Sequence, residues 1–231
     1  MDSSFWDTRY SSADFCYGTE PNAFVVECAA QIPPGPVLCL GEGEGRNAAF
    51  LATRGHPVTA VDQSAVGLAK ARQLAAHRGT TLTTVLSDLA AYPIAPGAWS
   101  AIIATFVHLP PPLRAEIHRA AAAGLCPGGV IVLEAYTPEQ LRHRTGGPVN
   151  NPELLMTLEA LRAEFSSLEL IIARELEREV REGTGHTGRG AVVQILARRL
   201  APHRSDLDAR MSHTSSLPAG ARPASAGYTR I

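Results

Sequence analysis

The sequence lacks an excess of charge, and it lacks long apolar runs. Its 231 residues carry 21 Lys and Arg against 22 Asp and Glu, a formal net charge of −1. Because so small a net charge gives no strong surrounding field, neither a nucleic acid nor an anionic membrane is expected as a partner. No apolar run reaches the roughly 20 residues that a membrane-spanning helix needs, and the N-terminus has no signal-peptide pattern. A cytoplasmic location is therefore expected.

Cysteine and lysine are scarce as well. The four cysteines, Cys16, Cys28, Cys39 and Cys126, include no C-x-x-C pair, so neither a zinc site nor a thioredoxin-type centre is indicated. We therefore expect no metal cofactor. Lys70 is the single lysine, and the other strongly basic residues are arginines.

Apolar runs alternate with helical patterns along most of the chain. Strands are expected at 36–41, 56–62, 81–88, 99–108 and 128–136, and helices at 46–55, 64–79 and 111–125. The strand-like runs are almost continuously apolar, which is typical of parallel strands buried on both faces of a sheet. The pattern predicts an α/β fold with a doubly wound Rossmann-like sheet.

The last third of the chain follows a different pattern. A helix is expected at 151–165, followed by strands at 168–180 and 191–200 that flank a glycine-rich turn at 181–190. Such a pair should form an antiparallel hairpin, which would end a mainly parallel sheet with an antiparallel strand. Residues 201–231 are rich in Ser, Pro, Ala, Gly and Arg without periodicity, which predicts a disordered tail after one domain at 1–200.

The stretch VLCLGEGEGRN, residues 37–47, runs from an apolar strand into a loop of alternating glycines. A dinucleotide-binding loop would carry its third glycine where Arg46 stands. The carboxylates of Glu42 and Glu44 would also repel a pyrophosphate, whereas a ligand with a positive centre meets no such conflict. The loop therefore favours S-adenosylmethionine, which carries a sulfonium and an ammonium group, over NAD.

Two aspartates follow at the ends of neighbouring strands. Asp62 ends the second strand, about 20 residues after the first loop glycine, where an acid accepts the ribose hydroxyls of an adenosine. Asp88 ends the third strand and would border the adenine. Either acid alone is as well explained by a structural role such as helix capping. Together with the glycine loop, the two acids make a stronger signal.

From Phe5 to about residue 199 the chain resembles the class I S-adenosylmethionine-dependent methyltransferases, and most of all their tellurite-resistance (TehB-like) branch. The resemblance is carried by FWDTRYSSADFCYGTEPNAFV, LCLGEGEGRNAAFLATRGHPVTAVDQSAVGLAKAR, VHLPPPLR, LCPGGVIVLEAYTPEQL and HTGRGAVVQILARR. It implies a seven-stranded sheet with an antiparallel last strand and an N-terminal cap at 1–24. One departure is Cys39, where many such enzymes carry Asp.

The N-terminal segment is rich in aromatic residues, six of which lie in the first 24 positions. They indicate a flap that closes over cofactor and substrate with ring faces near the sulfonium, the alternative being ordinary packing of an N-terminal helix. The loop, the acids and the resemblance together predict a set of cofactor contacts. These are Trp6, Tyr10, Tyr17, Gly41, Gly43, Gly45, Arg46, Asn47, Asp62, Gln63, Asp88, Leu89 and Thr105.

Methyl transfer requires an in-line nucleophile at short distance and the exclusion of water, but no catalytic triad. His186 and Arg189 lie in the predicted hairpin turn, where His186 could take a proton and Arg189 could hold an anionic substrate. Arg144, in the loop after the fifth strand, is a third catalytic candidate. A solvated hairpin tip and a polar surface loop are the alternatives. The resemblance supports the hairpin, since the tellurite-type family also uses His and Arg there.

We therefore expect a methyltransferase whose acceptor is a small soft or anionic nucleophile of the thiol, selenite or tellurite type. A catalytically silent S-adenosylmethionine-binding regulatory protein and an NAD-dependent oxidoreductase are the alternatives. The D/N-P-P-Y motif of enzymes that methylate amino groups in nucleic acids is absent. A small-molecule substrate and a monomer or weak homodimer are expected, without nucleic-acid or membrane partners.

Overall fold

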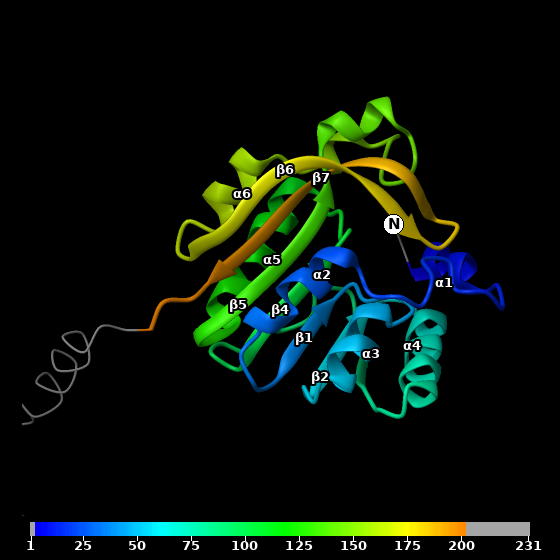
Figure 1. The fold of residues 1–231 in the computed structure, drawn as a ribbon, viewed down its shortest axis with the longest axis horizontal. Coiled ribbons are helices and arrows are strands. Elements are labelled where there is room, and N and C mark those ends of the chain that lie inside the picture. The colour runs from blue at the N-terminus through cyan, green and yellow to red at the C-terminus, as the bar shows by residue number, and fades with distance from the viewer. Residues whose placement is uncertain (1–2, 202–231) are drawn as a thin grey trace, which may run out of the picture. The chain divides into compact units, whose positions relative to one another are not determined.

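The computed structural model describes residues 3–201, and its centre is a seven-stranded sheet (Figure 1). The strands are β1 Val37–Leu40, β2 Val58–Asp62, β3 Thr83–Leu86, β4 Trp99–Thr105, β5 Leu125–Tyr136, β6 Glu169–Glu182 and β7 His186–Arg198. They lie in the order β3-β2-β1-β4-β5-β7-β6. The first five pair in parallel, whereas β7 is antiparallel to both β5 and β6. The predicted fold class is confirmed.

Helices cover both faces of this sheet (Figure 1). The α-helices are α1 Ser3–Tyr10, α2 Ala23–Cys28, α3 Arg46–Thr53, α4 Ala65–His77, α5 Pro111–Gly124 and α6 Leu158–Glu164, and 3₁₀ turns lie at Ala29–Gln31, Pro138–Arg142 and Pro152–Leu154. The apolar cluster on one face includes side chains of α2, α3 and α4, and that on the other face includes side chains of α5 and α6. The short α1 packs against α4.

Alternation along the central strands explains their nearly continuous apolar sequence. In β1, Leu38 and Leu40 face the cluster under α5 and α6, whereas Val37 and Cys39 face the cluster under α2, α3 and α4. Burial also raises the pKa of the Cys39 thiol, so this residue behaves as a small apolar side chain. The edge strand β3 differs, because it pairs only with β2 and stays partly exposed on both faces.

Two predicted boundaries in the last third were wrong. Strand β7 begins at His186, because backbone pairing continues to the Glu182–His186 pair and leaves only residues 183–185 as the turn. The predicted helix at 151–165 begins only at Leu158, where the side chain of Thr157 caps the first turn. The preceding residue, Met156, donates its N–H to the carbonyl of Tyr136 at 2.9 Å, which keeps this segment extended.

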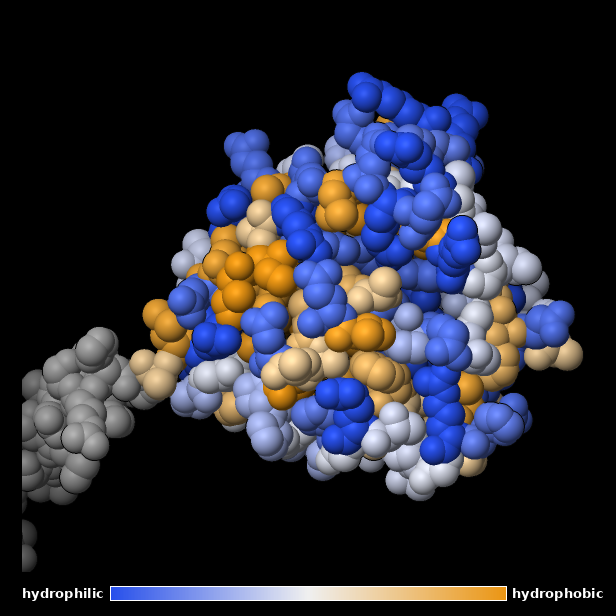
Figure 2. Space-filling view, viewed as in Figure 1, coloured by the Kyte–Doolittle hydropathy of each residue, from blue (hydrophilic) through white to orange (hydrophobic). Residues whose placement is uncertain are grey.

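The predicted tail, apart from residue 201, lies outside the described residues. None of the helices within residues 3–201 has the length and apolarity needed to cross a bilayer. Figure 2 shows apolar residues gathered over α2 and the first half of β6, where Val26 and Ile171 are exposed, and hydrophilic residues over the segment between β5 and α6.

We predict that Gly45→Ala destabilises the protein more than Gly55→Ala. Both glycines have a left-handed backbone, with φ of +88° and +90°, so each variant costs about 1–2 kcal/mol in strain. A Cβ on Gly45 would also lie 2.6 Å from the Cα of Ala71, whereas nothing lies within 4 Å of one on Gly55. The clash should add roughly 1–3 kcal/mol for Gly45 alone. Equal urea midpoints for the two variants would contradict this prediction.

Candidate active site

The glycine loop between β1 and α3 is a backbone surface that its neighbours approach closely. Gly41, Gly43 and Gly45 all have positive φ, at 56°, 60° and 88°. A Cβ on Gly41 would lie 2.9 Å from a methyl of Val107, and one on Gly43 would lie 2.6 Å from the hydroxyl of Tyr10. Any other residue at these positions would be strained and would displace Val107 or Tyr10, so the loop requires glycine.

The two carboxylates of this loop point into the protein, which corrects the interpretation of the loop as acidic toward its ligand. Glu42 Oε1 accepts hydrogen bonds from the backbone N–H groups of Asn47 and Ala48, at 2.9 and 2.8 Å. Burial raises the pKa of Glu42 to about 7. Its carboxylate thus caps α3 and occupies the N–H groups that a pyrophosphate would need. The loop still disfavours NAD, but for this reason.

The buried Lys70 neutralises the second loop carboxylate and holds the N-terminal segment. Its Nζ lies 2.6 Å from Glu44 Oε1 and donates to the carbonyls of Tyr10, Ser12 and Asp14 at 3.3, 2.9 and 2.7 Å. An ammonium group has three donors, so these acceptors satisfy it fully. The single lysine of the chain therefore joins α4, the glycine loop and the segment after α1.

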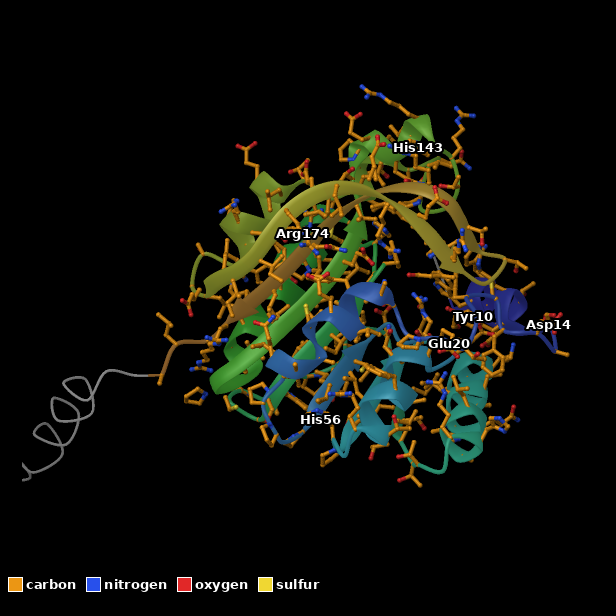
Figure 3. All side chains as sticks on the ribbon, viewed as in Figure 1. Tyr10, Asp14, Glu20, His56, His143 and Arg174 are labelled. Atoms are coloured by element: carbon orange, nitrogen blue, oxygen red, sulfur yellow. The ribbon has the colours of Figure 1, made fainter. Side chains whose placement is uncertain are left out.

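The N-terminal cap, residues 3–22, extends from α4 to the tip of the β6–β7 hairpin. At the α4 end, Asp7 accepts from Ser64 Oγ at 2.5 Å and from the backbone N–H of Val66 at 3.2 Å. At the hairpin end, the N–H of Gly185 donates to the carbonyl of Cys16 at 2.9 Å. Figures 1 and 3 show α1 and Tyr10 beside this tip. The cap thus covers the carboxyl edge of the sheet.

Asp62 holds the glycine loop in place and keeps acceptor capacity for a ligand. Its two oxygens accept from the N–H groups of Gly43 and Ser64, each at 2.8 Å, and burial raises its pKa. Each carboxylate oxygen has a second lone pair, so ribose hydroxyls remain possible donors. Gln63 follows directly in the chain. This position at the end of β2 is the one that the sequence predicted.

The other predicted cofactor contacts lie around the same edge. Asn47 donates to Thr105 Oγ1 at 2.9 Å, which joins α3 to the end of β4. The ring of Trp6 stacks on that of Tyr10 with centroids 5.7 Å apart. Asp88 is exposed two residues beyond β3 and accepts from the N–H of Ala90 at 2.9 Å, so its observed role is to cap a turn. Leu89 packs beside it against the core.

A group of six residues, called the His186 cluster below, meets under the cap where the ends of β4, β5 and β6 and the starts of β7 and α3 come together. It consists of Tyr17, Arg46, Phe106, Tyr136, Glu182 and His186. The ring of His186 lies 4.5 Å from that of Tyr17, 4.8 Å from that of Phe106 and 5.3 Å from that of Tyr136. Phe106 has a φ of +56°, a strained conformation for a bulky residue that is found preferentially at functional sites.

Buried ion pairs surround this cluster. Glu182 Oε2 lies 2.6 Å from Arg46 Nη2, and Glu182 Oε1 lies 3.0 Å from Arg178 Nη2. Arg178 also pairs with Glu134 at 2.6 Å, and the amide of Asn22 donates to both carboxylates. Two guanidinium groups thus face two carboxylates, and the network has no unpaired charge.

The same burial sets the ionisation of the histidine and of its acidic neighbour. Burial alone would raise the pKa of Glu182, but His186 and Arg46 beside it bring that pKa down to about 2. Burial lowers the pKa of His186 below its usual value, and Glu182 only partly opposes this effect. Nearby His108 has a pKa lowered to about 4 by burial. Both imidazoles are therefore neutral near pH 7.

Three buried polar atoms of the cluster have no hydrogen-bond partner within residues 3–201. They are Arg46 Nη1, Tyr136 Oη and His186 Nδ1. An unpaired buried group costs roughly 1–3 kcal/mol, so native proteins keep such groups mainly where a ligand or water completes them. Their convergence beside the glycine loop marks the His186 cluster as the ligand-binding part of the edge.

The structure does not bring Arg189 or Arg144 to this cluster. The Arg189 side chain is 64% exposed and pairs with Glu177 at 2.6 Å on the outer side of the hairpin. Arg144 is exposed in the loop after β5, where His143 also lies in Figure 3. No group of three or more His, Cys, Asp or Glu in the described part of the chain is placed to hold a metal ion.

Three cluster residues were not expected from the sequence, and Tyr17, like Arg46, was expected only as a cofactor contact. Tyr136 ends β5, and the rule that ligands lie beyond carboxyl ends of strands would have found it. Glu182 faces His186 across the hairpin, a pairing that requires the strand register. Phe106 carries no sequence signal.

Residues 37–129 match the model of a family described as methyltransferase domain. The match covers less than half of the chain, and over this segment the chain is similar to that family. A Bacillus subtilis (strain 168) protein named uncharacterized methyltransferase YodH is 31% identical over 83 residues, which are 36% of this chain and 36% of that protein. The matched stretch of the domain therefore spans little more than a third of that relative.

Solved structures show the same fold over most of the chain. One, from work on the conversion of a disulfide bond into a thioacetal group during echinomycin biosynthesis, has a TM-score of 0.73, 17% identity and coverage of 94% and 99% of the two chains. TehB from Haemophilus influenzae has a TM-score of 0.64, 21% identity and coverage of 85% and 66%. N-methyltransferase NodS from Bradyrhizobium japonicum WM9, solved with S-adenosyl-L-homocysteine, has a TM-score of 0.64 and 12% identity, with coverage of 85% of this chain and 97% of NodS.

These likenesses support a class I methyltransferase fold. The residues of the edge fit S-adenosylmethionine, because Asp62 keeps acceptor capacity and Arg46 keeps an unpaired N–H. The likeness to TehB, at 21% identity, shows a shared fold only, so membership of the tellurite-resistance branch stays a proposal.

We predict that Lys70→Met loosens the cap and lowers the free energy of unfolding by about 3–5 kcal/mol, because Glu44 is left as a buried unpaired carboxylate. The double variant Lys70→Met with Glu44→Gln should recover part of that loss. Arg72→Met, on the exposed face of the same helix, is the matched control. Urea unfolding and amide hydrogen exchange of residues 3–22 give the readout, and unchanged exchange in Lys70→Met would contradict the assignment.

Proposed function

We propose that the chain is an S-adenosylmethionine-dependent methyltransferase of a small soft or anionic nucleophile, of the thiol, selenite or tellurite type. The observation that carries this proposal is the His186 cluster, a buried histidine and unpaired donors beside a glycine loop and under a cap. The cytoplasmic location and the monomeric or weakly dimeric state stay predictions.

The proposed cofactor would be held by groups that the fold has already placed. The backbone of the glycine loop and Arg46 would contact its amino-acid part, and Asp62 would accept its ribose hydroxyls. When bound, S-adenosylmethionine supplies an electrophilic methyl group. The protein then has three tasks, which are to orient the acceptor in line, to exclude water, and to remove a proton where the acceptor carries one.

The cap and the hairpin support a small acceptor. They meet through Gly18 and Gly183, and a Cβ on Gly183 would lie 2.4 Å from the N of Gly18. So close a backbone contact leaves no passage there for a macromolecule. The likeness to a structure from sulfur chemistry in echinomycin biosynthesis and to TehB supports a soft nucleophile such as sulfur, selenium or tellurium.

Two measurements separate this proposal from its alternatives. Turnover of S-adenosylmethionine with a panel of thiols, selenite and tellurite is expected for the enzyme. A regulatory protein would bind S-adenosylmethionine without forming a methylated product. An oxidoreductase would bind NAD in preference to S-adenosylmethionine in a calorimetric titration, and that result would contradict the proposal.

We predict that Asp62→Ala weakens the binding of S-adenosylmethionine and of S-adenosylhomocysteine by roughly 10- to 100-fold. The ribose hydroxyls would lose a charged acceptor worth about 1.5–3 kcal/mol. Asp14→Ala is the control, because the side chain of Asp14 is exposed and only its carbonyl contacts Lys70. Isothermal titration of the folded variants tests the prediction, and unchanged affinity in Asp62→Ala would remove Asp62 from the cofactor site.

A further inference from the structure

We propose that the acceptor enters the site as a neutral thiol, that His186 takes the thiol proton, and that Glu182 is the positioning residue of His186. The inference deepens the proposed function and rests on it. It selects one acceptor class from the thiol, selenite and tellurite types, and it assigns a role to a carboxylate on β6.

The hairpin register places the two side chains opposite each other. Glu182 and His186 form the last pair of the β6–β7 ladder, so their backbones are fixed by the sheet. His186 Nδ1 lies 3.9 Å from Glu182 Oε2 and has no closer partner among the described residues. A shift of Nδ1 toward Glu182 Oε2 by about 1 Å would form a hydrogen bond. When Nδ1–H donates this hydrogen bond to Glu182, the basic lone pair of the imidazole lies on Nε2.

The charges of the site favour a neutral acceptor over an oxyanion. Arg46 and Arg178 beside the cluster already pair with Glu182 and Glu134, and Arg9 in the cap is exposed and donates to the Tyr17 hydroxyl at 2.8 Å. Arg189 pairs with Glu177 on the outer side of the hairpin, so it supplies no positive charge here. A selenite or tellurite anion would lose its hydration in a buried region where Arg46 and Arg178 are already paired, which costs several kcal/mol that only the sulfonium and the exposed Arg9 would offset. A neutral molecule meets no such cost.

The rings around His186 suit sulfur in particular. Tyr17, Phe106 and Tyr136 lie within 5.3 Å of the imidazole, centroid to centroid. Thiol and thioether sulfur make favourable contacts with aromatic edges at about 5 Å. A thiol whose hydrogen points toward His186 Nε2 would thus have aromatic neighbours for its sulfur.

The reaction balances in a single displacement. The S–H bond of the thiol breaks, and its proton goes to His186 Nε2. The sulfur lone pair forms the new S–C bond as the bond between the methyl carbon and the sulfonium sulfur breaks, and that electron pair stays on the departing sulfur. The products are a methyl thioether and S-adenosylhomocysteine, and the imidazolium returns its proton to solvent.

The pH dependence follows from the groups that face His186. They are Glu182 on β6, Arg46 on α3, Tyr136 on β5, Arg9 and Tyr17 in the cap, and His108 after β4. Burial lowers the pKa of His186, and turnover should rise with pH through that lowered value, since the neutral imidazole is the base. Loss of the Glu182 carboxylate removes the group that stabilises the imidazolium. The rising limb should then move to lower pH while the plateau falls.

The test compares wild type, Glu182→Gln and His186→Gln with the exposed controls Glu179→Gln and His77→Gln. Turnover is measured against pH with an aliphatic thiol, an aromatic thiol, selenite and tellurite. We expect wild type to prefer the thiols. In both site variants, turnover of the aliphatic thiol should fall about 100-fold or more. Turnover of the aromatic thiol should fall much less, because that thiol is already ionised. Binding of S-adenosylhomocysteine should change less than threefold in His186→Gln, whereas Glu182→Gln also loses its pair with Arg46 and is therefore judged by its pH profile and by the ratio of its losses with the two thiols.

A measurement on the wild type without cofactor keeps the proposal testable if Glu182→Gln does not fold. Nitrogen NMR of the histidine rings, with His186 assigned by its absence from His186→Gln, should show the Nδ1–H tautomer and an imidazole that titrates below its usual pKa. The Nε2–H tautomer would overturn the role of Glu182.

The remaining outcomes distinguish the two levels of the proposal. Methylation of selenite or tellurite but of no thiol would overturn the neutral-thiol inference while the proposed function stands. Equal losses with both thiols, or an unchanged pH profile in Glu182→Gln, would overturn the proton transfer. Binding of S-adenosylhomocysteine without turnover of any acceptor would overturn both the inference and the proposed function.

Discussion

The buried ion pair between Arg46 and Glu182 is the contact on which the rest of the ligand edge depends. It joins the first residue of α3, directly after the glycine loop, to the last residue of β6. Both side chains are nearly inaccessible, so either partner alone would be a buried unpaired charge costing about 3–5 kcal/mol. The same carboxylate faces His186 across the hairpin. The position of the glycine loop and that of the histidine are therefore set by one residue.

A second ion pair, Lys70 with Glu44, links the same loop to the cap. Because Lys70 also holds three backbone carbonyls of the cap, the shape of the loop and the closure of the cap depend on one ammonium group. Glu42 and Glu44 are both hydrogen-bonded within the protein, so neither loop carboxylate is directed at a ligand. Two independent ion pairs on either side of the loop thus make it rigid, which is what a cofactor cradle requires.

The sequence predicted what depends on local pattern, and missed what depends on pairing across space. Apolar runs and glycines located the strands, the loop and Asp62, because each signal lies within a few consecutive residues. The direction of the Glu42 side chain could not be predicted, since capping of α3 competes with facing a ligand. Arg189 was expected at the site because the hairpin turn was placed too wide. A strand that starts at His186 turns Arg189 to the outer side, where Glu177 pairs with it.

The His186 cluster accepts strain and unpaired groups that a purely structural core would avoid. Phe106 holds a left-handed backbone, and Arg46 Nη1, Tyr136 Oη and His186 Nδ1 have no partner in the described chain. Natural proteins break such local rules mainly at functional sites and compensate for them elsewhere. Here the compensation is visible in the neutral network of two arginines and two glutamates beside the cluster. Because that network pairs each arginine with a glutamate, Arg46 and Arg178 offer little net attraction to an anion, and the role proposed for His186 is therefore proton transfer.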